Sequence, residues 1–330
     1  QGSQRTGMLS DIRTRFKIVS DSLNQSEESL SGQLSRSLLE LLYPDESATA
    51  YDADVAQAEL TETRNCQASL LAVGMALTDL LDGIGVRPDV VAGHSVGEFT
   101  AAVAGGVLSR EDGLRLLVAR GGAMSDMTGD RGTMTAVMAD AKSAAGLLVD
   151  GAVIANVNHP RQTVVAGTTQ AMEQVVANAE LAGIKAVPLR VSHGFHSPVF
   201  AGLELDEVID ELKLNEPVIP VASCIIDHPY TDSAEAREVF KRHATSPVIF
   251  TETMEQCLEL GVEVFVQIGA GGPLRSFAAG SLAGRQGAVI NLASVEDDDG
   301  GQSLLSGLGE LWVRGINVDT SVITGTALIT

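Results

Sequence analysis

The pentapeptide Gly93-His94-Ser95-Val96-Gly97 matches G-x-S-x-G, the pattern of a serine held on a tight turn between a strand and a helix. The backbone is strained at such a turn, and glycines two before and two after the serine remove side chains that would collide. Ser95 would then project over a helix N-terminus, where the free N–H of Val96 could stabilise an oxyanion. The pattern predicts a nucleophilic serine, although a glycine–serine turn that only caps a helix would also produce it.

The residues on either side of Ser95 predict the strand and the helix that this turn requires. Residues 88–93 form a short apolar strand candidate, and residues 99–107 form a helix candidate directly after the turn. A second helix is expected over residues 111–124, and residues 66–82 carry a strong apolar helical pattern before the strand. This context favours a nucleophile over a simple helix cap.

The pattern of elements changes between residues 132 and 191, where it reads strand, helix, strand, strand, helix, strand. That order is typical of a ferredoxin-like βαββαβ module. The module looks inserted, because an α/β pattern resumes after it, with residues 265–271 as another buried strand. We therefore expect an α/β fold with two parts. Residues 1–130 and 192–330 would form a large α/β-hydrolase-like subdomain with a parallel sheet, and residues 131–191 a small ferredoxin-like subdomain.

The composition fits this fold and argues against several classes of protein. Of the 330 residues, 45% are hydrophobic but only 4% are aromatic, which suits parallel strands covered by helices. The net charge of −21 argues against nucleic-acid binding, because the phosphate backbone would be repelled. No apolar run reaches the roughly 18 residues of a membrane span, and no signal peptide is visible.

The cysteines and the remaining segments indicate a cytoplasmic protein without a structural metal. Cys66, Cys224 and Cys257 are far apart in apolar stretches, so we expect buried, reduced thiols. No Cys/His cluster has metal-ligand spacing. Residues 8–42 alternate polar and apolar side chains at helical spacing, and the acidic residues 296–301 are expected to form a solvated loop.

Several longer segments occur in an order that is highly specific when they are taken together. The string G-H-S-V-G-E begins at Gly93, and V-A-R-G follows at residues 118–121. The other segments are residues 1–4 (Q-G-S-Q), 131–137 (R-G-T-M-T-A-V), 158–162 (N-H-P-R-Q) and 192–198 (S-H-G-F-H-S-P). Together they resemble the malonyl-CoA:acyl-carrier-protein transacylase family over nearly the whole chain. The resemblance is strongest to acyltransferase domains of type I polyketide synthases, and it suggests an iterative synthase of the enediyne or polyunsaturated-fatty-acid kind.

The resemblance implies a catalytic pair, with Ser95 as the nucleophile and His196 as the base that activates it. The two residues are far apart in the sequence, so only the fold can bring them together. His193 competes for the same role from the same segment. The resemblance also implies that the backbone N–H groups of Gln1 and Val96 form the oxyanion hole.

The resemblance further implies four substrate-binding residues, which are Arg120, Phe195, His193 and Gln67. Arg120 would bind the free carboxylate of malonyl, because a planar guanidinium offers two parallel hydrogen bonds. The alternative for Arg120 is an interaction with the helix macrodipole. Gln67 matches a glutamine near the pocket, and the alternative is an ordinary polar residue at a helix start. Phe195, in the substrate-facing segment with His193, predicts a preference for malonyl, because its ring leaves little room for the α-methyl of methylmalonyl.

The sequence departs from the family pattern at two places. The family has a buried strand before Q-G-S-Q, and its absence leads us to expect that the chain begins inside this motif. His243 stands where relatives usually carry Asn or Gln. The family orients the catalytic histidine with a backbone carbonyl at that position, so we assign this role to His243 through its main chain.

The reaction implied by the resemblance is a ping-pong transfer. Malonyl would pass from malonyl-CoA to Ser95 and then to the phosphopantetheine thiol of an acyl carrier protein, with no tightly bound cofactor and no metal. The chain would be part of a larger multidomain synthase. Two alternatives stay open: a thioesterase or esterase of the α/β-hydrolase type, in which an acidic residue orients His196, and a catalytically silent domain kept for assembly.

Overall fold

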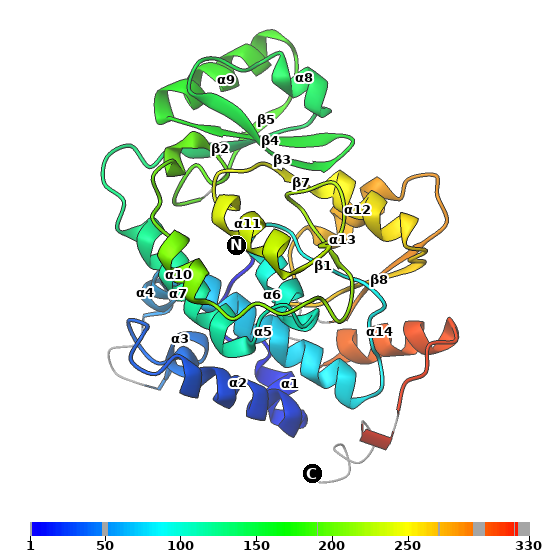
Figure 1. Cartoon of the computed structure of the whole chain (residues 1–330). Coiled ribbons are helices and arrows are strands. Elements are labelled where there is room, and N and C mark those ends of the chain that lie inside the picture. Colours follow the sequence, from blue (N-terminus) through cyan, green and yellow to red (C-terminus); the bar gives the residue numbers. More distant parts are fainter. Residues whose placement is uncertain are drawn as a thin grey trace.

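The computed structural model describes residues 2–47, 52–189, 191–269, 271–292, 301–319 and 321–322. Helices from the first part of the chain gather at one side of the molecule, and a small sheet covered by two helices lies at the opposite end (Figure 1). The acidic residues 296–300 lie outside the described residues, so the predicted loop there stays a prediction.

The N-terminal part of the chain is helical. Its helices are α1 (Ser10–Arg15), α2 (Lys17–Ser29), α3 (Leu38–Leu42), α4 (Ala53–Thr61) and α5 (Thr63–Gly83). The helical alternation over residues 8–42 is therefore divided among three helices. Phe16 is extended between α1 and α2, and Ser37 starts α3 with a capping box in which it and Glu40 satisfy each other's backbone N–H.

Helices α5 and α7 (Arg110–Ser125) approach closely at Gly121, and this places two predicted site residues together. A Cβ added to Gly121 would lie 2.5 Å from the Cα atom of Arg64, so only glycine permits this approach. The predicted helices over 66–82 and 111–124 are thus confirmed, and their contact brings Arg120 beside Gln67.

The predicted α/β fold is confirmed, but the parallel strands of the large part form two separate pairs. One pair joins β1 (Val91–Ala92) to β6 (Val221–Ala222), and the other joins β8 (Val264–Gln267) to β9 (Ala288–Asn291). The remaining elements of this part are α6 (Gly97–Ala104), η1 (Pro198–Phe200), α10 (Asp206–Glu211), α11 (Ser233–Arg242), α12 (Phe250–Glu259), α13 (Leu274–Ser281) and α14 (Gln302–Val313).

The small sheet follows the predicted βαββαβ order. Its elements are β2 (Thr133–Val137), α8 (Ala141–Ala145), β3 (Ala152–His159), β4 (Gln162–Gly167), α9 (Thr169–Leu181) and β5 (Ala186–Pro188). Four antiparallel strands take the order β5-β2-β4-β3, and β7 (Val248–Ile249) adds a fifth strand parallel to β3. The fifth strand, which makes the sheet mixed, was not predicted, because a two-residue strand from a distant segment leaves no periodic signal. The proposed subdomain boundaries at 131 and 191 stay a prediction.

Cys66, Cys224 and Cys257 are all free and buried, as expected. Among the described residues, we find no helix that combines the length and the apolar composition of a membrane span.

Candidate active site

Ser95 stands on the turn that the sequence predicts, between β1 and α6. Its φ angle is 53°, in the left-handed region that residues other than glycine rarely adopt. A Cβ on Gly93 would lie 2.1 Å from the carbonyl carbon of Gly97, so the first glycine of the motif is required. A Cβ on Gly97 would meet nothing within 4 Å, so the second glycine is not required by the surrounding atoms, contrary to the steric argument from the motif.

His196 reaches Ser95 across the fold. Its Nε2 atom lies 2.6 Å from Ser95 Oγ, although 101 positions separate the two residues. His196 also has a positive φ, 58°, so both partners are held in strained backbone conformations. His193, the predicted competitor, bonds through Nδ1 to the neighbouring Ser192 hydroxyl at 2.8 Å instead.

The carbonyl that orients His196 belongs to Ser246, and the prediction of His243 for this role is wrong. His196 Nδ1 lies 2.9 Å from the Ser246 carbonyl oxygen. A carbonyl only accepts, so Nδ1 carries the proton and Nε2 presents a lone pair to the Ser95 hydroxyl. The carbonyl one residue before Pro247 faces the ring, whereas His243 ends helix α11 and turns its side chain into the core.

Arg120 is buried on α7, with 3% of its surface exposed, and has no ion pair among the described residues. Its Nη1 donates to Gln67 Oε1 at 2.8 Å, and its Nε is buried without a hydrogen-bond partner. Burial lowers the pKa of Arg120 to about 10, so the guanidinium stays charged at neutral pH. An incompletely satisfied buried cation of this kind is suited to an anionic ligand.

Phe195 and His193 lie in an aromatic cluster behind the catalytic segment. The Phe195 ring is stacked on Phe200, with centroids 5.7 Å apart, and lies 5.6 Å from the His193 ring. Gly194 fits closely here, because an added Cβ would lie 3.2 Å from the carbonyl oxygens of Gly167 and Thr133. The segment is therefore tightly packed at Gly194.

Of the two predicted oxyanion donors, the structure describes Val96 but not Gln1. Val96 precedes the first residue of α6, and its N–H donates to none of the acceptors in the described part of the chain. This donor is therefore available beside Ser95, at a helix N-terminus that favours negative charge.

A chain of hydrogen bonds that sequence reasoning missed connects the small sheet to the residue before Ser95. His94 Nε2 lies 2.7 Å from Asn158 Oδ1, and Asn158 Nδ2 donates to Gln162 Oε1 at 3.0 Å. Burial lowers the pKa of His94 to about 4, so this ring is neutral. The segment 158–162 (N-H-P-R-Q) was visible in the sequence, but nothing there indicated that Asn158 would bond to His94.

A second missed feature is a buried carboxylate one turn after Ser95. Glu98 is fully buried and accepts four hydrogen bonds. The donors are the Ser223 hydroxyl at 2.6 Å, the Tyr230 hydroxyl at 2.5 Å, and the Cys224 backbone N–H and thiol at 3.1 and 2.7 Å. Burial acts to raise the pKa of Glu98, but contacts with His243, Cys224 and Ser223 outweigh it and lower the pKa below its usual value.

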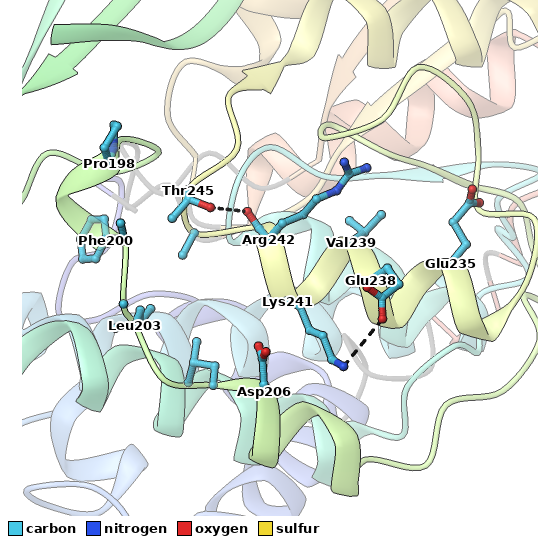
Figure 2. A pocket seen from close by; sticks show the side chains of 14 residues that line it. Pro198, Phe200, Leu203, Asp206, Glu235, Glu238, Val239, Lys241, Arg242 and Thr245 are labelled. Carbon is cyan, nitrogen blue, oxygen red and sulfur yellow. Dashed lines mark hydrogen bonds and ion pairs between the residues drawn. The ribbon is translucent and has the colours of Figure 1, made fainter. Parts of the chain in front are cut away.

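A groove of about 1010 Å³ lies apart from these residues, between the segment after His196 and helix α11 (Figure 2). Its wall includes Phe200, Leu203 and Lys241, and none of Ser95, Arg120 or His196. Lys241 is already paired with Asp210 at 2.8 Å and faces Glu238 at 3.7 Å. The chemistry therefore belongs to the serine turn and not to this groove.

An α/β fold that presents a serine on a strained turn, hydrogen-bonded to a histidine, is the arrangement found in enzymes that work through an acyl-serine. The acyl transferase domain family matches residues 1–279, and the chain belongs to that family.

Two curated relatives and one solved structure show the extent of the similarity. The chain is 35% identical over 329 residues to the spectinabilin polyketide synthase system protein NorB of Streptomyces orinoci, covering 97% of the chain but 15% of that protein. It is 31% identical over 282 residues to the malonyl CoA-acyl carrier protein transacylase of Bacillus subtilis, covering 82% of the chain and 84% of the transacylase. The acyltransferase domain from the second module of the salinomycin polyketide synthase superposes with a TM-score of 0.87 at 30% identity, covering 98% of this chain and 74% of that one.

Proposed function

We propose that the chain transfers malonyl from malonyl-CoA to Ser95 and then to the phosphopantetheine thiol of an acyl carrier protein. The observation that carries this proposal is the Ser95–His196 hydrogen bond in a site whose buried Arg120 has no carboxylate partner among the described residues. The named transacylase of similar length acts with malonyl-CoA and an acyl carrier protein, which supports the same two substrates here.

The first half-reaction follows from the hydrogen-bond directions. Malonyl-CoA binds with its free carboxylate on Arg120. Ser95 Oγ attacks the thioester carbon while His196 Nε2 takes the hydroxyl proton, and the N–H groups of Val96 and Gln1 stabilise the oxyanion. The C–S bond then breaks, and the CoA thiolate takes the proton from His196. The carrier thiol reverses these steps on the malonyl-serine ester, so the cycle needs no further cofactor.

The orienting group on His196 favours transfer over the hydrolase alternative. A thioesterase or esterase of the α/β-hydrolase type would place an acid on Nδ1, and here the Ser246 carbonyl occupies that position. A carbonyl keeps the tautomer without adding a negative charge beside the base.

We also propose the finer features of the function. Phe195, beside His193, favours malonyl over methylmalonyl, since one methyl group is typically worth about 1–3 kcal/mol in a tight pocket. The chain covers only 15% and 4% of two polyketide synthases that it matches, which supports a place in a larger synthase. We propose a cytoplasmic location for that synthase. An iterative synthase of the enediyne or polyunsaturated-fatty-acid kind remains our proposal for the parent.

Intact mass spectrometry after exposure to separate acyl-CoAs tests the proposal. Malonyl-CoA should add one malonyl group to the wild type and none to Ser95→Ala, whereas methylmalonyl-CoA and acetyl-CoA should load more slowly. Addition of the carrier should then remove the group from the protein and place it on the carrier. A malonylated Ser95→Ala protein, or release of free malonate in place of transfer, would refute the proposal.

A further inference from the structure

Besides its four hydrogen-bond donors, the buried Glu98 has one more polar contact, the imidazole of His243. This ring also faces the catalytic base, His196. His243 Nε2 lies 3.5 Å from Glu98 Oε2, and both side chains are fully buried. The His243 ring also stands edge-on to the His196 ring, with centroids 5.7 Å apart. His243 thus lies between a buried carboxylate and the imidazole that activates Ser95.

The two imidazoles differ in what they touch. His196 bonds to the Ser95 hydroxyl and the Ser246 carbonyl, which are both neutral. Among the described residues, the ring nitrogens of His243 make no hydrogen bond of ordinary geometry. Its Nε2 faces the Glu98 carboxylate, and the Ser95 backbone also interacts with the ring. The apolar ring of Phe99 also lies against it, with centroids 4.7 Å apart.

We propose that His243 is a positioning residue that keeps His196 uncharged, because a proton entering this buried pair of imidazoles is held on His243, against Glu98. The proposal rests on acyl transfer through Ser95. It provides a way to keep the base unprotonated below neutral pH, although no carboxylate among the described residues bonds to it.

The charges around the pair support this distribution of protons. Two imidazolium ions 5.7 Å apart would repel each other strongly in a buried site, so the pair holds one proton before it holds two. Burial holds the pKa of His196 well below its usual value, and the charged or titratable groups close to it, His243, Arg120 and His94, lower it further. Burial lowers the pKa of His243 as well, but there Glu98 acts to raise it, whereas Arg120 lowers it; the neutral thiol of Cys224 is the other titratable group nearby.

A metal ion is the competing explanation for this cluster. Potential ligand atoms of Glu98, Cys224 and His243 lie within 4.8 Å of one another. However, Glu98 Oε1 already accepts from Ser223 and Tyr230, and Oε2 from the backbone and thiol of Cys224. Four donors already fill the lone-pair sites of this carboxylate, which leaves none for a metal ion. His243 therefore interacts with Glu98 through charge, at 3.5 Å.

The pH dependence of malonyl-serine formation in a single turnover tests the proposal. His243→Asn keeps a polar amide beside Glu98 but removes the titrating group. The acidic limb of the pH–rate profile should therefore move to higher pH by about one unit, because the positive charge of protonated His243 no longer opposes protonation of His196. His228→Asn is the matched control, because His228 is 48% exposed at its side chain and should leave the limb in place. An unchanged limb in His243→Asn would overturn the proposal.

Titration of the histidine C2–H signals by NMR tests the order of protonation without turnover. His243 should begin to titrate at higher pH than His196, and His196 should titrate at higher pH in His243→Asn. Titration of His196 before His243 would refute the inference, and so would one equivalent of zinc in the purified protein that a chelator removes. If Ser95 takes up no acyl group, the proposed function fails, yet this titration still decides the role of His243.

Discussion

Two buried charges lie near Ser95, and the protein treats them in opposite ways. Glu98 is 0% exposed and accepts four hydrogen bonds from Ser223, Cys224 and Tyr230. Arg120 is 3% exposed, donates one hydrogen bond to Gln67 and keeps its Nε unpaired. The anion is therefore complete within the protein, whereas the cation is not.

This difference separates a structural charge from a ligand-binding charge. Burying an ion without partners is costly, so an incompletely paired cation persists when another interaction outweighs that cost. A substrate carboxylate would supply the missing partner for Arg120. For Glu98, no such partner is missing, and its removal would leave the surrounding donors without an acceptor.

The largest effect on stability is expected for Glu98→Ala. Four donor groups would lose their acceptor in the core, and the free energy of unfolding should fall by about 3–5 kcal/mol. Urea denaturation followed by circular dichroism measures this change. Glu173→Ala, on the exposed face of α9, is the control and should change the value by less than about 0.5 kcal/mol. A stable Glu98→Ala protein would remove one side of the comparison.

The next effect concerns binding and should appear in Arg120→Ala. Loss of the charged partner should slow malonyl loading by roughly 10² to 10³-fold, equivalent to about 3–4 kcal/mol, because the substrate carboxylate loses its hydrogen bonds. Acetyl loading should not fall, because acetyl has no carboxylate. Quenched-flow loading assays with malonyl-CoA and acetyl-CoA measure the ratio of the two loading rates in the wild type and the variant. Equal losses for the two substrates would show that Arg120 acts on the fold and not on the carboxylate.

The smallest effect tests whether Arg120 can be satisfied from within. Gln67→Glu would place a carboxylate at the atom that now lies 2.8 Å from Arg120 Nη1. The new ion pair should compete with malonyl and slow its loading by about 10-fold. Gln67→Met, which is neutral and of similar size, serves as the control. If Gln67→Glu loads malonyl at the wild-type rate, Arg120 has enough N–H donors for both the introduced carboxylate and the malonyl carboxylate.

Much of the fold could be predicted from local patterns. The helices over 66–82 and 111–124 and the βαββαβ order carried long periodic signals, and the structure contains each of them. The addition of β7 to the small sheet could not be predicted, because its two residues have no periodicity of their own. Their place depends on an exposed edge of β3 made by residues about ninety positions earlier.

The site divides in the same way. By itself, the sequence determined the sharp turn at Ser95, since Gly93 removes a Cβ that no neighbour could accommodate. Only the tertiary structure decided that Ser246 and not His243 offers its carbonyl to His196, and that Glu98 lies among donors from a distant segment. The physical reason is one of range: steric limits act between adjacent residues, whereas hydrogen-bond partners across a core are chosen by the packing of the whole chain.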